Sequence, residues 1–282
     1  MKLIKQSFEF INQTDFSLVG IKKHIERCAR VSYKSEDKIT DTSYEKFVNM
    51  LESRGHDRPL EFGTVYLDIP TNNLEPGDEY IYAVGKYYCN PWSIKEDFNN
   101  HAYISTNYRV IKENHWEDDL QYLCEPTKHH HKRYTVHMIL DRGVMDEFRT
   151  HVGLSHLAES TRYCNYSKDK FDNELTFIDP CWEIKTANER ITPEGTHVSS
   201  DALEFLIALN EAEDHYLSLL AKGWTPQQAR SILPLCIKSE LISCGFEDAW
   251  ENFFKRRDAP DAHPMAQEIA QPMHEEFLKL VE

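Results

Sequence analysis

The order of periodic segments along the chain limits the fold more than any other feature. Strand-like alternation of apolar and polar residues occurs in the first half, at residues 7–12, 61–69, 103–111 and 133–140, with a shorter strand near 80–84. Helical three- and four-residue spacing dominates the last third, at 200–221, 246–257 and 265–281, and Pro226 stands where another helix would start. Strands followed by helices predict an α+β fold, with a C-terminal part that is mostly helical.

Three further helices are expected in the first half. The first spans about 17–32, and the second has an apolar stripe at 44–51 that Gly55 is placed to end. The third spans 143–152 and leads into a polar, irregular segment at 153–166. The turn-rich segments 72–78 and 90–100 are expected to be loops. Because loops often carry binding and catalytic groups, we expect the chemistry to lie in 153–166.

No linker, low-complexity run or internal repeat divides the 282 residues, so a single domain spanning 1–282 is expected. Neither GxGxxG nor GxxxxGK[ST] occurs, which disfavours a parallel nucleotide-binding sheet. The sequence also lacks an export signal and an apolar run of the roughly 18 residues that a membrane span needs. Seven cysteines without a CxxC pair favour a reducing, cytoplasmic location and no metal site.

The net charge of −15 opposes binding to a nucleic-acid polymer, because such binding depends on many lysine and arginine side chains. An anionic ligand must therefore be held by a local concentration of arginine. Two such concentrations occur, at residues 142–162 and 230–257. They are the segments in which a phosphate site is expected.

Three separated blocks of sequence carry a recognisable pattern. The first, at 54–67, reads RGHDRPLEFGTVYL, and the second, at 150–171, reads THVGLSHLAESTRYCNYSKDKF. The third reads ARSILPLCIKSEL at 229–241 and is followed by AWENFFKRR at 249–257 and AHPMAQEIA at 262–270. In this order and approximate spacing the blocks resemble the flavin-dependent thymidylate synthase family over most of the chain.

The resemblance implies a fold, a reaction and a set of partners. The fold would be a central twisted antiparallel sheet flanked by helices. The reaction would be reductive methylation of dUMP to dTMP with FAD, NADPH and the folate 5,10-methylenetetrahydrofolate, in a homotetramer with active sites formed between subunits. No protein nucleophile would be required. Accordingly, Cys236 lies in apolar surroundings, without the Pro-Cys-His context of other thymidylate synthases, and is expected in the core.

The resemblance also implies roles for particular residues. The residues expected to act in catalysis are Ser160 and Arg230. Those expected to bind dUMP are Ser160, Arg162, Arg230 and Arg257. Those expected to bind FAD are His56, Arg58, Glu61, His151, Asn252 and His263.

Elementary chemistry supports a phosphate site at Ser160 and Arg162. A nucleotide monophosphate is a dianion, and a hydroxyl, a guanidinium and free backbone N–H groups can converge on it from one irregular segment. The same residue types also suit a plainer role, in which they cap the preceding helix and pair with nearby acids. On an ideal helix Asn252 and Arg256 share a face while Arg257 is rotated by about 100°, so the two arginines cannot both enter one site.

The sequence departs from the family where cofactor contacts are expected. Thr150, His151 and Val152 stand where the family has Arg-His-Arg, so both arginines are missing. Arg58 replaces the usual serine or threonine before a proline, Phe62 replaces a histidine, and Ala158 replaces a glutamate or glutamine. Arg58 and Arg149 are the candidates to replace the lost charge. Two alternative functions remain open: a related pyrimidine-nucleotide one-carbon transferase and a non-catalytic nucleotide-binding paralogue.

Overall fold

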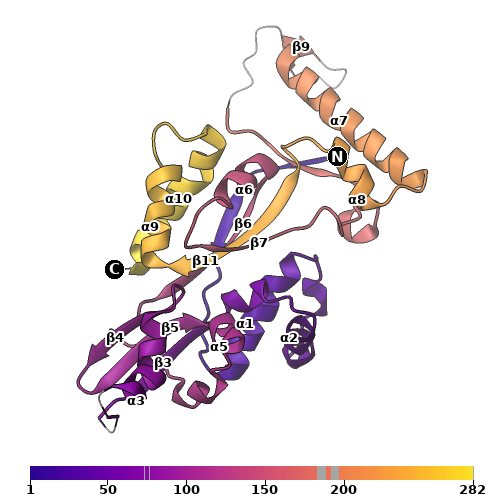
Figure 1. Cartoon of the computed structure of the whole chain (residues 1–282). Helices are drawn as coiled ribbons and strands as arrows, with labels where there is room; N and C mark the ends of the chain where they lie inside the picture. Colours follow the sequence, from indigo (N-terminus) through magenta and orange to yellow (C-terminus); the bar gives the residue numbers. More distant parts are fainter. Residues whose placement is uncertain (73, 76, 183–188, 192–196, 282) are drawn as a thin grey trace.

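A four-stranded antiparallel sheet forms the centre of the protein (Figure 1). The computed structural model describes residues 1–72, 74–75, 77–182, 189–191 and 197–281. The strands lie in the order β2, β6, β11, β7 and span β2 (Ser7–Phe10), β6 (Arg133–Asp141), β11 (Lys238–Phe246) and β7 (Ser155–Ala158). The sheet thus combines strands from widely separated parts of the chain, and the predicted α+β class is confirmed.

The pairing of β6 with β11 runs along the whole length of both strands. It begins with Lys238 opposite Asp141 and ends with Phe246 opposite Arg133. Every residue of β11 except the two at its ends is buried. The expectation of a mostly helical C-terminal part omitted this strand, because a strand covered on both faces lacks the alternation that marks a half-buried one.

Helices cover both faces of the central sheet. On one face, α1 (Leu18–Val31) packs Ile25 and Cys28 against Ile242 and Cys244 of β11. The other face is covered by α6 (Arg142–Phe148), α9 (Glu247–Arg257) and α10 (Pro264–Val281). There the indole of Trp250 is fully buried and donates a hydrogen bond of 3.0 Å to the carbonyl of Tyr134. These two apolar layers fix the positions of the elements that carry the site.

A second, smaller antiparallel sheet lies beside α1 and α2 (Ser43–Ser53). Its strands are β3 (Thr64–Pro70), β5 (His101–Asn107) and β4 (Ile94–Phe98), in that order. The strand predicted at 61–69 begins late because Pro59 lies in a 3₁₀ turn, η2 (Arg58–Phe62). The strand predicted at 103–111 ends early because the side chain of Asn107 accepts from the N–H of Val110 and starts α5 (Tyr108–Glu113).

Three predictions about local structure were wrong. Residues 80–84 are helical, in α3 (Asp78–Tyr80), η3 (Ile81–Gly85) and α4 (Lys86–Tyr88), because Val84 and Tyr87 are buried at a helical spacing. The segment 90–100 contains β4, and the segment 153–166 contains β7. Both strands are short. β7 gains its hydrogen bonds from β11, which is distant in sequence, whereas β4 forms a hairpin with β5 across the turn at Asn99 and Asn100, both at positive φ.

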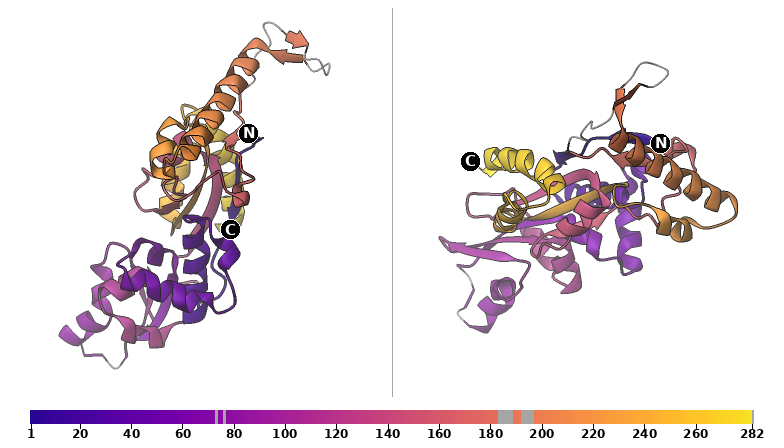
Figure 2. Two further views of the ribbon diagram at one scale, coloured as in Figure 1. Left: turned by 90° about the vertical axis from the view of Figure 1, so that its right-hand side faces the viewer. Right: turned by 90° about the horizontal axis from the view of Figure 1, so that it is seen from above.

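The helix α7 (Ser200–Ala221) extends from the body, with the hairpin of β9 (Glu189–Ile191) and β10 (His197–Ser199) at its far end (Figure 2). Its other end packs Leu209 and Tyr216 against Phe177 and Ile237. There β8 (Thr176–Ile178) pairs in parallel with β1 (Lys2–Ile4). Pro226 does begin a helix, α8 (Pro226–Ala229), which continues into η6 (Arg230–Ile232).

The remaining short helical turns are η1 (Glu36–Lys38), η4 (Glu117–Tyr122) and η5 (Asp169–Phe171). Among the residues that the structure describes, no helix has the length and apolar character needed to cross a membrane. All seven cysteines lie in that part of the chain, and each is a free thiol.

Candidate active site

A cleft of about 710 Å³ lies where the two halves of the chain meet around β7. Its wall combines the last turn of α1, the segment 55–59, Arg109 of α5, Arg142 and Arg149 at the two ends of α6, residues 156–161 with Tyr163, and Arg230 of η6. Gly55 has a φ of +64°, which glycine adopts without strain, and this lets the chain turn from α2 into the wall. The cleft is therefore assembled from six segments that are distant in sequence.

Arginine dominates the charge of this cleft. The arginines that line it are Arg58, Arg109, Arg142, Arg149 and Arg230, while the acidic residues are Asp57 and Glu159. A local excess of guanidinium groups favours an anion, and guanidinium suits phosphate in particular. The chain as a whole has a net charge of −15, but positive charge is concentrated in this cleft, so an anion can bind there.

The five arginines differ in how much of their charge is already paired. Arg109 forms ion pairs with Glu61 and Glu113, and Arg142 and Arg149 share Asp146 at 3.6 Å and 3.5 Å. The guanidinium of Arg230 donates to the hydroxyl of Thr161 at 3.2 Å. Arg58 is exposed and forms neither a hydrogen bond nor an ion pair with any residue that the structure describes. Arg58 and Arg230 are thus the cations best able to pair with a ligand.

Ser160 lies on a turn that follows β7 and lines the cleft. Its N–H donates to the carbonyl of Ser32 at 3.2 Å, and its carbonyl accepts from the N–H groups of Tyr163 and Cys164 at 3.0 Å and 3.1 Å. The Ser160 hydroxyl has no protein partner within the described ranges and can donate to a ligand. The backbone of the turn is held on both sides while the hydroxyl stays available.

His156 gives the cleft a neutral polar wall. Burial lowers its pKa to about 4, so the ring is uncharged near neutral pH. Its Nδ1 accepts from the Ser243 hydroxyl at 2.8 Å, and its Nε2 lies 3.4 Å from the carbonyl of His151. The ring is therefore fixed by β11 on one side and by the end of α6 on the other.

The structure brings four of the ten predicted site residues together in the cleft: His56, Arg58, Ser160 and Arg230. Arg162 lies outside it, because its Nε donates to the side chain of Gln227 at 3.0 Å and its guanidinium lies over the ring of Tyr163. Glu61 reaches the wall only through its ion pair with Arg109. The assigned roles of all ten residues remain predictions.

Arg257 and His151 lie together at the C-terminal end of α6. Arg257 donates to Nε2 of His151 at 2.8 Å, to the carboxylate of Glu147 at 2.7 Å and to the Glu147 carbonyl at 2.9 Å. Burial, together with the charge of Arg257, lowers the pKa of His151 to about 4, so the ring is neutral and can accept this hydrogen bond. Arg257 is thereby held against the helix end and does not line the cleft.

The two remaining predicted residues are exposed: Asn252 lies on α9, and His263 immediately precedes α10. Nδ1 of His263 accepts from the N–H of Met265 at 3.3 Å, in the first turn of α10. Neither residue lines the cleft. No group of three or more histidine, cysteine, aspartate or glutamate side chains in the described ranges is arranged to hold a metal ion.

Two cleft arginines, Arg109 and Arg142, were not proposed from the sequence. Nothing in the sequence marks Arg109 as a site residue, because it follows a strand and lies outside the three recognisable blocks. Arg142 and Arg149 are seven residues apart, a spacing that returns to the same side of a helix. That spacing, within the arginine-rich segment already noted, could have identified this wall of the cleft.

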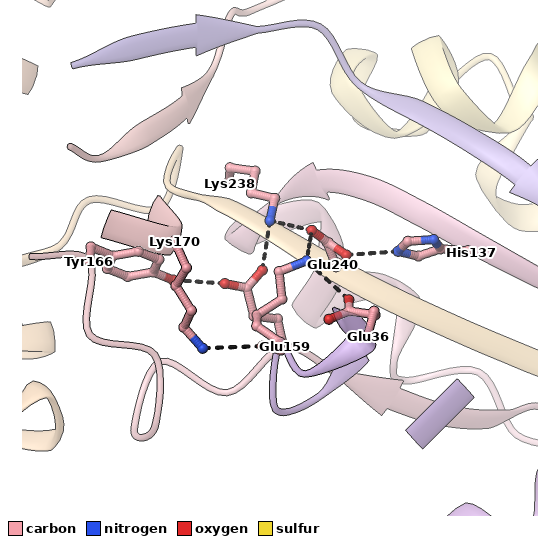
Figure 3. A network of polar contacts seen from close by, with 8 residues as sticks. Glu36, His137, Glu159, Tyr166, Lys170, Lys238 and Glu240 are labelled. Atoms are coloured by element: carbon pink, nitrogen blue, oxygen red, sulfur yellow. Dashed lines mark hydrogen bonds and ion pairs between the residues drawn. The ribbon is translucent and has the colours of Figure 1, made fainter. Parts of the chain in front are cut away.

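A network of buried ion pairs lies next to Ser160 (Figure 3). Lys238 lies between the carboxylates of Glu159 and Glu240, at 2.9 Å from Glu159, and Glu240 also pairs with Lys34 and with His137. Although burial alone would raise it, the pKa of Glu240 is held well below its usual range by the His137 hydrogen bond and the two lysine charges. Both carboxylates are therefore anchored beside the turn.

The chain matches a known family over most of its length. The sequence model of a family described as "Thymidylate synthase complementing protein" matches residues 87–281, which is more than half of the chain. No curated protein matches the sequence.

Two solved structures are similar to this chain over most of its length. Both are of PolB from Streptomyces cacaoi, described as a UMP/dUMP methylase, one bound with 5-Br UMP and the other with 5-Br dUMP. Each is 16% identical with a TM-score of 0.44, and the similarity covers 99% of this chain and 92% or 93% of the PolB chain.

Proposed function

Because this chain belongs to the thymidylate synthase complementing protein family, we propose that it catalyses the reductive methylation of dUMP to dTMP. In this proposal 5,10-methylenetetrahydrofolate provides the carbon, and FAD and NADPH are the cofactors. The protein is a cytoplasmic homotetramer with one domain per chain. The observation that supports the proposal best is the cleft whose wall contains five arginines together with the available hydroxyl of Ser160.

The cleft suits the phosphate of a nucleotide. Ser160 donates its hydroxyl and Arg230 its guanidinium, which is held near Ser160 by its hydrogen bond to the neighbouring Thr161. Arg142 adds charge from α6. Arg162 is exposed and can join the phosphate by exchanging its contact with Gln227. Arg257 remains a candidate only if its four hydrogen bonds at the end of α6, to Glu147, Thr150 and His151, are released.

The donor set also suits the pyrophosphate of FAD in spite of the missing arginines. Arg58 has no partner among the residues that the structure describes, and Arg149 has only a weak contact with an exposed aspartate, so both can pair with an anion. His56 lies beside Arg58 in the same wall. When bound, reduced FAD would supply the electrons that convert the transferred methylene group to a methyl group. The protein would hold the nucleotide and the cofactor in the relative positions that the reaction requires, and would exclude water.

The cysteines support a reaction without a thiol nucleophile. All seven lie in the described part of the chain, and none lines the cleft. Burial raises the pKa of Cys236 to about 11 and that of Cys164 to about 12, so both are protonated at neutral pH. A protonated thiol is a poor nucleophile.

One observation favours the non-catalytic alternative. Val152, which stands in place of a family arginine, is 85% exposed, and the Thr150 hydroxyl donates to the carbonyl of Glu147 at 2.7 Å. Neither residue can replace a charge. A protein that keeps the nucleotide site but has lost the flavin would show these substitutions, and flavin binding therefore decides between the two functions.

The proposal is tested with purified protein in three measurements. FAD is titrated into the apo-protein with and without dUMP, dUMP binding is followed by calorimetry, and the products formed from dUMP, the folate and NADPH are identified. Saturable FAD binding and formation of dTMP are expected. A different methylated or hydroxymethylated pyrimidine would favour the related one-carbon transferase. Failure of FAD to bind in either condition would rule out the flavoenzyme.

A further inference from the structure

We propose that Lys238 is a positioning residue for the nucleotide site, and that its ammonium group holds Glu159 in a buried orientation and thereby places Ser160. The inference rests on the proposed function, because it assumes that Ser160 contacts the nucleotide. Lys238 does not line the cleft. The contact that connects it to the cleft is its ion pair with Glu159, the residue that precedes Ser160.

Each carboxylate oxygen of Glu159 has a separate donor. Oε2 lies 2.9 Å from Nζ of Lys238, and Oε1 accepts from the hydroxyl of Tyr166 at 3.0 Å. The Glu159 side chain is 1% exposed and that of Lys238 is 14% exposed. Figure 3 shows the Glu159 carboxylate between these two donors, one from β11 and one from the segment that follows the turn. Two donors from different elements fix the direction of the side chain.

The backbone connects this side chain to the cleft. The N–H of Glu159 donates to the carbonyl of Glu240 at 2.8 Å, and the next N–H, of Ser160, donates to the carbonyl of Ser32 at 3.2 Å. Ser32 also lines the cleft. A change in the direction of the Glu159 side chain would strain the first of these hydrogen bonds and shift the residue on which the Ser160 hydroxyl is carried.

The two glutamates depend on Lys238 to different degrees. Without Lys238, Glu240 would keep Lys34 and His137 as partners. Glu159 would keep the hydroxyl of Tyr166 and the weak thiol donor of Cys164, with no cation from the described residues. A buried carboxylate without a compensating cation is strongly unfavourable. Glu159 is thus the group that would turn toward water, and two spaces are open to it: the cleft that it lines and the cavity lined by Lys238 and Tyr166.

The test compares dUMP binding to Lys238→Met with binding to the double variant Lys238→Met/Glu159→Gln. We expect the single variant to raise the dissociation constant by about tenfold or more, which is the loss expected when one hydrogen bond to a charged phosphate is no longer made. The double variant should recover most of the affinity. A neutral amide needs no cation, and its oxygen can still accept from Tyr166.

Two further lysine substitutions serve as matched controls. Lys34→Met removes a cation from the same network through Glu240 but leaves the pair of Lys238 with Glu159 intact. Lys95→Met, on β4, removes a buried lysine that has an acidic and a tyrosine partner, Asp97 and Tyr80, in another sheet. Both variants should bind dUMP nearly as well as the wild type, and urea unfolding establishes that each variant is folded when it is titrated.

Ionic strength separates positioning from a long-range effect of charge. Added salt screens the field of a distant charge, whereas it does not restore a displaced hydroxyl. The loss of affinity in Lys238→Met should therefore persist in titrations at high salt. A loss that disappears with salt, an equal loss in Lys34→Met or Lys95→Met, or no recovery in the double variant would overturn the inference.

The wild-type titration distinguishes failure of this inference from failure of the proposed function. If the wild type binds dUMP and Lys238→Met binds it equally well, only the role of Lys238 is refuted. If the wild type does not bind dUMP, the proposed function fails, and the inference about Lys238 fails with it.

Discussion

Replacement of Arg230 by methionine should weaken dUMP binding with little effect on the fold. Arg230 is exposed, and its side chain donates one hydrogen bond, to Thr161 at 3.2 Å. An exposed contact of this kind contributes about 1 kcal/mol or less to the free energy of unfolding. A charge-assisted hydrogen bond to phosphate contributes about 1.5–3 kcal/mol, which corresponds to an affinity loss of roughly 10- to 150-fold.

The assay is calorimetric titration of dUMP into wild type, Arg230→Met and Arg162→Met, with urea unfolding of each protein as a measure of stability. Arg162 is the matched control, because it is also exposed and also donates to one side chain, but it lies outside the cleft. We expect the smaller loss in Arg162→Met. Equal affinity of Arg230→Met and the wild type would refute the reasoning from the cleft. A dominant loss in Arg162→Met would show that the resemblance locates the phosphate better than the observed contacts do.

Two other substitutions test the proposed function, and a third tests the protonation state of a buried histidine in the core. Arg58→Ala should lower FAD occupancy, because an unpaired guanidinium is lost from the cleft wall, and flavin fluorescence during titration measures it; unchanged occupancy would remove Arg58 from the site. Cys236→Ser should keep its turnover in a dTMP assay, whereas inactivity of a folded variant would indicate a thiol mechanism. Burial lowers the pKa of His24 from 6.5 to about 3, so the unfolded chain takes up the proton first and stability falls as the pH drops below 6.5. His24→Leu should lose less stability than the wild type between pH 6.5 and 4 in urea unfolding, and parallel losses would contradict a buried neutral His24.

The helices were predictable where one face of an element is apolar and its ends carry local signals. The expected helix at 17–32 is α1, which begins after Ser17 because the Ser17 hydroxyl accepts from the N–H of Gly20 at 3.1 Å. Strand β11 carried no such signal. Its Lys238 and Glu240 are inward-facing charges whose partners lie in other elements, so their burial cannot be inferred from neighbouring residues.

The candidate site was predictable only in part, because sequence blocks identify some of its residues and tertiary contacts place the others. Ser160 and Arg230 lie within recognisable blocks, and the structure places both in the cleft. Arg109 lies outside these blocks and reaches the wall because β5 ends at Asn107 and α5 begins. The position of Arg257 could not be predicted either. Its place on a helix does not indicate that Glu147 and His151, from another part of the chain, bind its guanidinium. Tertiary partners decided each of these cases.

The central sheet has a consequence for synthesis of the protein. β6 forms its longest ladder with β11, and the contact between His137 and Glu240 joins residues 103 apart in sequence. During translation β6 therefore emerges with one edge unpaired. That edge stays unpaired until β11, about a hundred residues later, has been synthesised. Closing so long a loop slows folding, and an unpaired edge can associate with other chains. We expect the nascent protein to depend on chaperones until β11 has left the ribosome.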